Sequence, residues 1–177
     1  MILAIALDLG STSVKAGLLG QDGKLSNIIS QPAATINANG GHYESDALSY
    51  AAIADRVLNT CVVQSGLAQT NELPPLGICS QRSSFLIWEK DSGKPVTPLI
   101  SWQDNRGAES CVALQAQEPL ITSLTGLRLT PYFFATKLRV VLLQNPVWRE
   151  RLERGDLLVG TLDTFLIWRW TGGRHHM

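Results

Sequence analysis

The chain has 177 residues, and its 15 Lys and Arg residues balance its 15 Asp and Glu residues. This length can bury one stable core, and the zero formal net charge gives no preference for nucleic acid or an anionic membrane. The first residues are apolar but lack a basic leader, and they reach Asp8 too early for a signal peptide or a membrane span. We therefore expect a small molecule or another protein as partner, and a homo-oligomer is compatible with this composition.

The three cysteines are Cys61, Cys79 and Cys111, an odd number at wide spacing and without a CxxC pair. This pattern argues against a disulfide framework and against a zinc site. A reducing compartment, the cytoplasm, is the simple inference.

Residues 2–7 are an uninterrupted apolar run, which predicts a strand buried on both faces. Asp8 follows where the strand leaves the core, and Gly10 allows close approach of backbone to a ligand. The loop continues with hydroxyl and amide donors from Ser11, Thr12 and Ser13. Together these residues predict a cradle for nucleotide phosphates and Mg²⁺. The alternative is a hairpin whose polar loop only caps two strands. Neither a Walker loop nor a dinucleotide fingerprint is present.

A second apolar run leads to a turn at residues 21–23, and residues 24–31 predict a third strand in an antiparallel meander. Residues 32–45 are rich in Pro, Ala, Asn and Gly and are expected to form a loop. Residues 47–65 have apolar side chains at spacings of three and four, which predicts an amphipathic helix that Gly66 stops.

Downstream, apolar runs and helical spacing alternate along the chain, which indicates an α/β domain. The pattern predicts strands over residues 76–80, 85–89, 96–102 and 157–159, and helices over residues 104–117, 134–144 and 161–170. Asp104 is expected to cap the first of these helices rather than to contact a ligand. Trp168 and Trp170 are expected to belong to a surface that another part of the protein covers.

Five segments together resemble the FGGY family of carbohydrate kinases, with the glycerol kinases as the most similar members. They are residues 6–15, 77–82, 88–106, 125–137 and 160–168. The resemblance spans nearly all of residues 1–177 and corresponds to the N-terminal domain of the family. It implies an incomplete ribonuclease H-like ATPase domain of the actin and hexokinase type, with a mixed sheet and flanking helices. The C-terminal ATPase domain would be absent, so we expect a truncated form.

By this resemblance the cofactors are ATP and Mg²⁺. Asp8 would hold Mg²⁺ through water, and the residues facing the nucleotide phosphates would be Gly10, Ser11, Thr12, Ser13 and Lys15. Lys15 stands where glycerol kinases usually have Arg, which keeps the charge but loses the planar fork of donors.

The resemblance also implies a pocket for a sugar or polyol, bound by Arg82, Trp102 and Tyr132. Ser83 stands where glycerol kinases have a Glu that binds glycerol hydroxyls. A Ser hydroxyl offers one short donor and acceptor, whereas a carboxylate accepts two charge-assisted hydrogen bonds. A sugar, a ketose or another polyol is therefore as good a candidate substrate as glycerol.

The implied activity is ATP-dependent phosphorylation of a sugar or polyol hydroxyl. No catalytic residue is expected in this chain, because the general base of the family lies in a Gly-Asp motif beyond the region covered here. The isolated chain is accordingly expected to be inactive. The alternative is a non-catalytic sugar-binding or interaction module derived from a truncated kinase.

Overall fold

The computed structural model describes residues 1–70 and 72–176. The strands form two sheets rather than one. The first sheet has the order β3 (Leu25–Pro32), β2 (Ser13–Gly20), β1 (Ile2–Leu9) and β6 (Leu76–Ser80). The second has the order β4 (Asn37–Asn39), β5 (His42–Ser45), β8 (Leu99–Ile100), β7 (Phe85–Glu89) and β9 (Leu157–Thr161).

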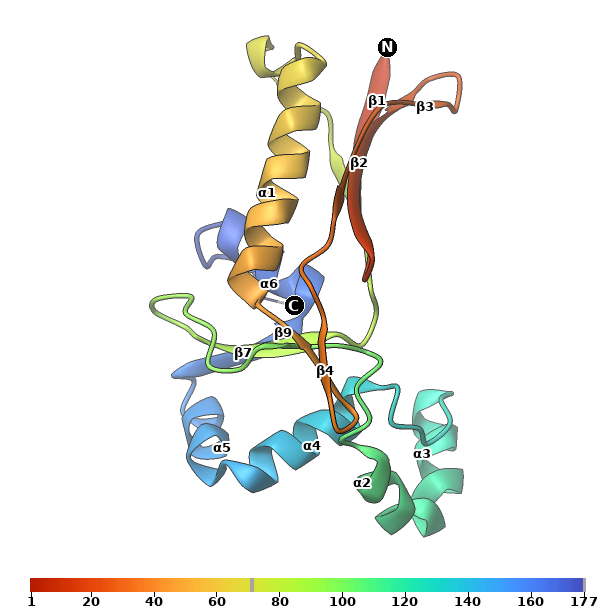
Figure 1. The fold of residues 1–177 in the computed structure, drawn as a ribbon, viewed down its shortest axis with the longest axis vertical. Coiled ribbons are helices and arrows are strands. Elements are labelled where there is room, and N and C mark those ends of the chain that lie inside the picture. Colours follow the sequence, from red (N-terminus) through yellow and green to blue (C-terminus); the bar gives the residue numbers. More distant parts are fainter. Residues whose placement is uncertain (71, 177) are drawn as a thin grey trace.

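The helices flank these sheets. They are α1 (Ala47–Gln64), α2 (Ala108–Ala113), α3 (Glu118–Thr125), α4 (Phe134–Gln144), α5 (Pro146–Glu153) and α6 (Leu162–Trp170), with short 3₁₀ turns at Leu67–Gln69 and Gln115–Gln117. In Figure 1, α1 stands beside the first sheet, the second sheet crosses below it, and α2 to α5 lie beneath the second sheet. None of the helices within the described residues combines the length and apolar character that a membrane crossing needs.

The antiparallel meander β1–β2–β3 is confirmed, and β6 pairs parallel to β1. Helix α1 covers one face of this sheet, toward which Ile5, Leu7 and Leu9 point, and all three are buried. The prediction that this strand is buried on both faces is wrong. Ala4 and Ala6 are partly exposed, because no element among the described residues packs on their face. That open face carries an apolar hollow of about 520 Å³.

One core joins the first sheet to the second sheet through α6. Trp88 of β7 is fully buried, and its ring lies 5.1 Å from Phe165 and 5.8 Å from Trp168 of α6. The indole of Trp170 donates a hydrogen bond to Asp55 of α1 at 2.7 Å. Both C-terminal tryptophans therefore make contacts within this chain. The sequence had predicted that they belong to a surface that another part of the protein covers.

The predicted loop over residues 32–45 contains the hairpin of β4 and β5. Its strands lack apolar alternation, and Gly40 and Gly41 form the turn with positive φ angles of 57° and 86°. The strand predicted over residues 96–102 is reduced to Leu99–Ile100. Pro146, interpreted as a stop after α4, also begins α5, since a proline fits the first turn of a helix.

Candidate functional site

The turn between β1 and β2 presents two opposite charges on the open face of the first sheet. Asp8 lies opposite Lys15 in the antiparallel ladder and beside Cys79 of the parallel strand β6. Both charged side chains are exposed, and neither has an ion-pair partner within the described part of the chain. Their neighbours Leu9 and Val14 point into the core, which holds the two charges on the outer face.

Gly10 is held in a tight turn. Its N–H donates to the Ser13 carbonyl at 3.1 Å, and its own carbonyl accepts from the Tyr50 hydroxyl at 2.7 Å. Burial raises the pKa of Tyr50, the hydrogen bond with Gln81 lowers it, and the Asp8 carboxylate raises it; the net effect is upward. Tyr50 therefore remains a protonated donor that ties this turn to α1.

The turn also places the predicted hydroxyl residues at the surface. Thr12 is exposed, and Ser11 and Ser13 are half-buried. The Thr12 carbonyl accepts from the N–H of Ala33 at 3.0 Å, which fixes the far side of the turn to the segment after β3.

Gly10→Ala is expected to lower the free energy of unfolding by roughly 1–3 kcal/mol. A Cβ atom there would lie 2.7 Å from the Ser13 carbonyl oxygen, so the turn would have to open. Gly77→Ala is the matched control in the same sheet, because its Cβ would meet only the Ile5 carbonyl at 3.9 Å. Urea unfolding followed by circular dichroism measures both. Equal stability of the two variants would mean that the turn is not tightly packed.

Residues 81–84 form a second loop that lies directly beside the first. The N–H of Gln81 donates to the Leu9 carbonyl at 2.9 Å, which extends the β1–β6 pairing into the loop. The buried Ser84 hydroxyl donates to the Gln81 side chain at 3.0 Å and accepts from the Trp102 N–H at 3.0 Å. A continuous hydrogen-bonded path therefore runs from the turn after β1 to Trp102.

The ring of Trp102 stacks on Tyr132, with ring centroids 5.5 Å apart and an interplanar angle of 17°. Tyr132 is 56% exposed, so the stack forms part of the surface. Arg82 is exposed and has no ion-pair partner among the described residues. Ser83 is half-buried and has a φ of 64°, an uncommon conformation for a residue other than glycine. The four predicted substrate residues thus lie on three segments. Ser84 joins residues 81–84 to Trp102, and the ring stack joins Trp102 to Tyr132.

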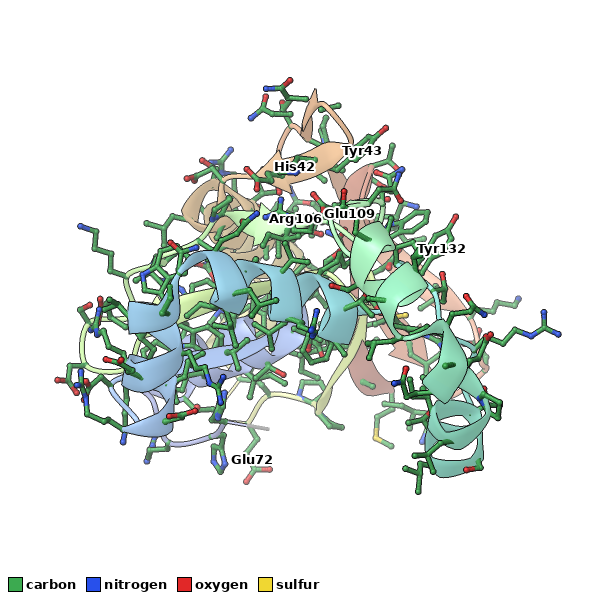
Figure 2. All side chains as sticks on the ribbon, turned by 90° about the horizontal axis from the view of Figure 1, so that it is seen from below. His42, Tyr43, Glu72, Arg106, Glu109 and Tyr132 are labelled. Atoms are coloured by element: carbon green, nitrogen blue, oxygen red, sulfur yellow. The ribbon has the colours of Figure 1, made fainter. Side chains whose placement is uncertain are left out.

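A separate hollow of about 750 Å³ lies between the β4–β5 turn and helices α2 and α4. Three of the residues that line it are labelled in Figure 2, namely His42, Arg106 and Glu109. Tyr132, also labelled there, does not line it. None of the predicted site residues lines this hollow.

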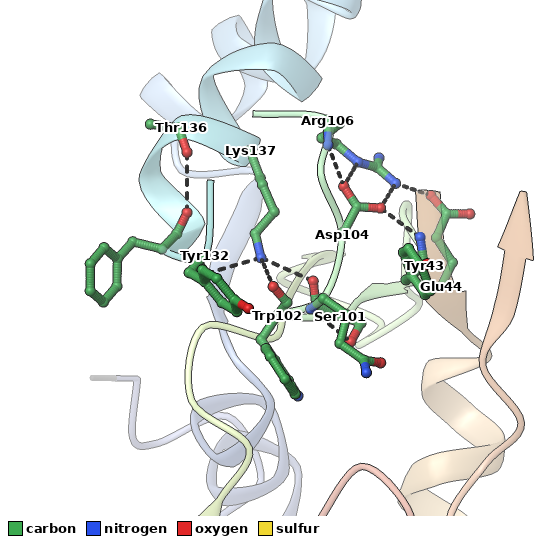
Figure 3. A network of polar contacts seen from close by, with 11 residues as sticks. Tyr43, Glu44, Ser101, Trp102, Asp104, Arg106, Tyr132, Thr136 and Lys137 are labelled. Carbon is green, nitrogen blue, oxygen red and sulfur yellow. Dashed lines mark hydrogen bonds and ion pairs between the residues drawn. The ribbon is translucent and has the colours of Figure 1, made fainter. Parts of the chain in front are cut away.

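Lys137 was not among the predicted site residues, although its side chain joins the loops that carry them. It is fully buried, and its ammonium group donates to the carbonyls of Ser101 at 2.9 Å, Trp102 at 3.2 Å and Tyr132 at 3.2 Å (Figure 3). The sequence signal that could have singled it out is a lysine on the apolar face of the 134–144 helix, beside Leu138 and Val141.

Asp104 and Arg106 form a buried ion pair that the sequence did not reveal. Asp104 is fully buried and accepts hydrogen bonds from Nε and Nη2 of Arg106, at 2.7 and 2.8 Å, and from the N–H of Tyr43 at 2.8 Å. Arg106 also pairs with Glu44 of β5 (Figure 3). The predicted capping role is wrong, because α2 begins only at Ala108 and no side chain caps it.

The pKa values of this pair follow from two opposing effects. Burial acts to raise the pKa of Asp104, but the hydrogen bonds from Arg106 and Tyr43 outweigh it, and the pKa is lowered. Burial likewise acts to lower the pKa of Arg106, but its bonds to Asp104 and Glu44 raise it overall. Both groups therefore stay charged, and the pair ties the β4–β5 hairpin to the segment that follows Trp102.

The chain is similar to glycerol kinases along its length. It is 39% identical to the glycerol kinase of Shewanella amazonensis and 37% identical to that of Shewanella sp. strain W3-18-1. Each alignment covers 175 residues, which are 98% of this chain and 35% of the relative. The chain therefore spans about a third of the length of these relatives.

Solved structures share the fold. The structure of Plasmodium falciparum glycerol kinase with ADP matches 97% of this chain and 35% of its own, with a TM-score of 0.82 at 22% identity. Xylulose kinase from Rhodospirillum rubrum matches 93% of this chain and 33% of its own, with a TM-score of 0.78 at 21% identity. The fold is thus the ribonuclease H-like fold of the actin type.

The family comparison covers almost every residue. Residues 3–177 match the N-terminal domain of the FGGY family of carbohydrate kinases. The chain therefore belongs to the FGGY family of carbohydrate kinases.

Proposed function

We propose that residues 1–177 supply the phosphate cradle and one wall of the substrate pocket of an ATP-dependent carbohydrate kinase. The observation that supports this proposal is the hydrogen-bonded path from Leu9 through Gln81 and Ser84 to Trp102. This path links two groups of residues with different chemistry. The first is the set of charges and amides beside Asp8, and the second is the set of hydrogen-bonding and aromatic side chains beside Trp102.

The first group fits nucleotide phosphates and Mg²⁺. Asp8 is an exposed carboxylate without an ion-pair partner in the described residues, and Mg²⁺ prefers oxygen ligands and retained waters. Lys15 lies opposite Asp8 in the ladder and carries the positive charge that would neutralise phosphate, and Thr12 is exposed in the turn beside them. When bound, Mg²⁺ would offset the charge that develops in phosphoryl transfer.

The second group fits a polyol. Stacked Trp102 and Tyr132 offer an apolar wall for carbon-bound hydrogens, and Arg82 offers several donors to hydroxyl oxygens. The hydroxyl proton would pass to a base outside residues 1–177, so we propose that turnover needs a C-terminal ATPase domain. The substrate is proposed to be a sugar or a polyol, with the preference set in part by Ser83.

The proposed function is tested with the chain joined to a C-terminal ATPase domain. A coupled ADP assay should detect turnover with at least one of glycerol, pentuloses, hexuloses and pentitols, in the presence of ATP and Mg²⁺. No turnover with any of these compounds would refute the kinase proposal and favour a non-catalytic module.

Ser83→Glu is expected to shift relative kcat/KM toward glycerol by about tenfold or more, because a carboxylate there can accept two hydroxyl hydrogen bonds. The matched control is Ser92→Glu, which adds the same charge in an exposed turn at the other end of β7. The assay is the same substrate panel. An unchanged substrate ranking in Ser83→Glu would place the specificity determinant elsewhere.

A further inference from the structure

Lys137 makes an arrangement of hydrogen bonds that only an ammonium group can make in full. Its three acceptors are the backbone carbonyls of Ser101, Trp102 and Tyr132, which lie 36, 35 and 5 residues away in sequence. A lysine ammonium carries three donors, whereas a neutral amine carries two and presents a lone pair to the third carbonyl. The number of donors matches the number of acceptors.

Two of these three carbonyls belong to the residues whose rings stack. The bonds to Trp102 and Tyr132 are both 3.2 Å long, and the stacked rings have centroids 5.5 Å apart. Lys137 therefore fixes the backbone of each aromatic residue relative to the other. Outside this link, Trp102 is held by the Ser84 hydroxyl and Tyr132 by the Thr130 hydroxyl, through their N–H groups, so the two loops have separate supports.

A role in packing alone does not account for Lys137, because the burial of its ammonium group has a desolvation cost. Lys137 has no exposed surface, and an apolar side chain of similar length would fill the same space without a desolvation cost. On these grounds, and resting on the proposed function, we infer that Lys137 is a positioning residue for substrate, which sets the spacing of the Trp102 and Tyr132 rings against which a sugar or polyol binds.

The charge state of Lys137 gives this role a pH dependence. Burial lowers the pKa of Lys137 to about 8, with Asp104 acting to raise it and Arg106 to lower it. The ammonium form with three donors therefore prevails at neutral pH, and the amine prevails above pH 8. The other charged or titratable groups at this cluster are Asp104 and Arg106 from the loop before α2, Glu44 from β5 behind Arg106, and the Tyr132 phenol.

The first experiment measures ring positions in the 177-residue chain with ¹³C-labelled aromatic side chains. Resonances of Trp102 are identified by their loss in Trp102→Phe, and they report the ring current of Tyr132. We expect Lys137→Met to shift them at pH 7. We expect the wild-type resonances to titrate with a midpoint near pH 8, and this titration to be absent in Lys137→Met.

Two control variants make the assignment specific. Lys24→Met removes an exposed lysine from the turn after β2 and should leave both the resonances and the titration unchanged. Tyr132→Phe keeps the ring but removes the phenol hydroxyl. The Trp102 resonances of this variant should still titrate with a midpoint near pH 8. Trp102 resonances that coincide in wild type and Lys137→Met would overturn the inference. If Lys137→Met does not fold, a flat wild-type titration between pH 6.5 and 9.5 overturns it.

The second experiment separates this inference from the proposed kinase activity. In the chain joined to a C-terminal ATPase domain, Lys137→Met should raise KM for the polyol about tenfold and change KM for ATP less than about twofold. A lower kcat with unchanged KM and unchanged ring resonances would mean a purely structural lysine. Absence of wild-type turnover with every polyol would refute the proposed function, and the ring resonances alone would then decide whether Lys137 positions the rings.

Discussion

Asp8→Asn is expected to lower kcat about 10- to 100-fold in the chain joined to a C-terminal ATPase domain. The amide keeps the size of the side chain but loses the negative charge that would orient the water ligands of Mg²⁺, and losses of about 10- to 100-fold are typical when such an outer ligand is removed. The folded state should be little affected, because Asp8 is exposed and has no ion-pair partner among the described residues. A coupled ADP assay over a range of Mg²⁺ concentrations measures the first effect, and urea unfolding measures the second.

Asp91→Asn is the control for this prediction. It removes the same charge from an exposed turn after β7, far along the chain from the Gly10 turn, and should leave kcat unchanged. Full activity of Asp8→Asn at saturating Mg²⁺ would show that the turn after β1 does not hold the metal. Loss of activity together with a large loss of stability would show a structural role for Asp8 instead.

Arg106→Met is expected to lower the free energy of unfolding by about 3–5 kcal/mol, the usual cost of removing one partner of a buried ion pair. Its removal leaves Asp104, which has no exposed surface, with the backbone N–H groups of Tyr43 and residue 106 as its remaining hydrogen-bond donors among the described residues. Urea unfolding of the 177-residue chain measures the loss. The matched control is Arg154→Met, whose partner Asp156 is 46% exposed, and which should cost less than about 1 kcal/mol.

The pH dependence of this pair has a definite sign. Asp104 has a lowered pKa in the folded chain, so its contribution to stability is present above the ordinary pKa of an aspartate. The contribution is lost as the pH falls through the lowered value. The difference in stability between wild type and Arg106→Met should therefore shrink in acid. A difference that stays constant from neutral pH to pH 2 would contradict the assignment of the stability to this pair.

The turn after β1 was predictable from sequence because its determinants are local. An apolar run, a carboxylate, a glycine and hydroxyl residues follow one another within residues 2–13, and their order alone defines a strand and a polar turn. The same holds for α1, where Asp46 accepts a hydrogen bond from the N–H of Ser49 and Gly66 takes a positive φ of 76° after the last turn.

The connections between elements were not predictable, because they depend on residues far apart in sequence. The bond from Gln81 to Leu9 requires β6 to lie parallel to β1, and nothing in residues 81–84 specifies that partner. The role of Lys137 depends on carbonyl groups, which every residue carries and no sequence pattern marks. The prediction that both faces of β1 are buried failed for a related reason. An apolar residue such as Ala4 fits a covered face and an uncovered face equally well, so its identity does not show which one it lies on.

In the loop of residues 81–84, the two end residues and the two middle residues have different roles. Gln81 and Ser84 make the bonds that hold the loop to Tyr50 and Trp102, whereas no hydrogen bond of the Arg82 or Ser83 side chain occurs within the described residues. Substitutions at these two positions therefore break no side-chain hydrogen bond of the fold, although the positive φ of Ser83 disfavours β-branched residues there. If residues 82 and 83 bind substrate as proposed, sugar preference can change while the turn after β1 and its hydrogen bonds to this loop stay the same.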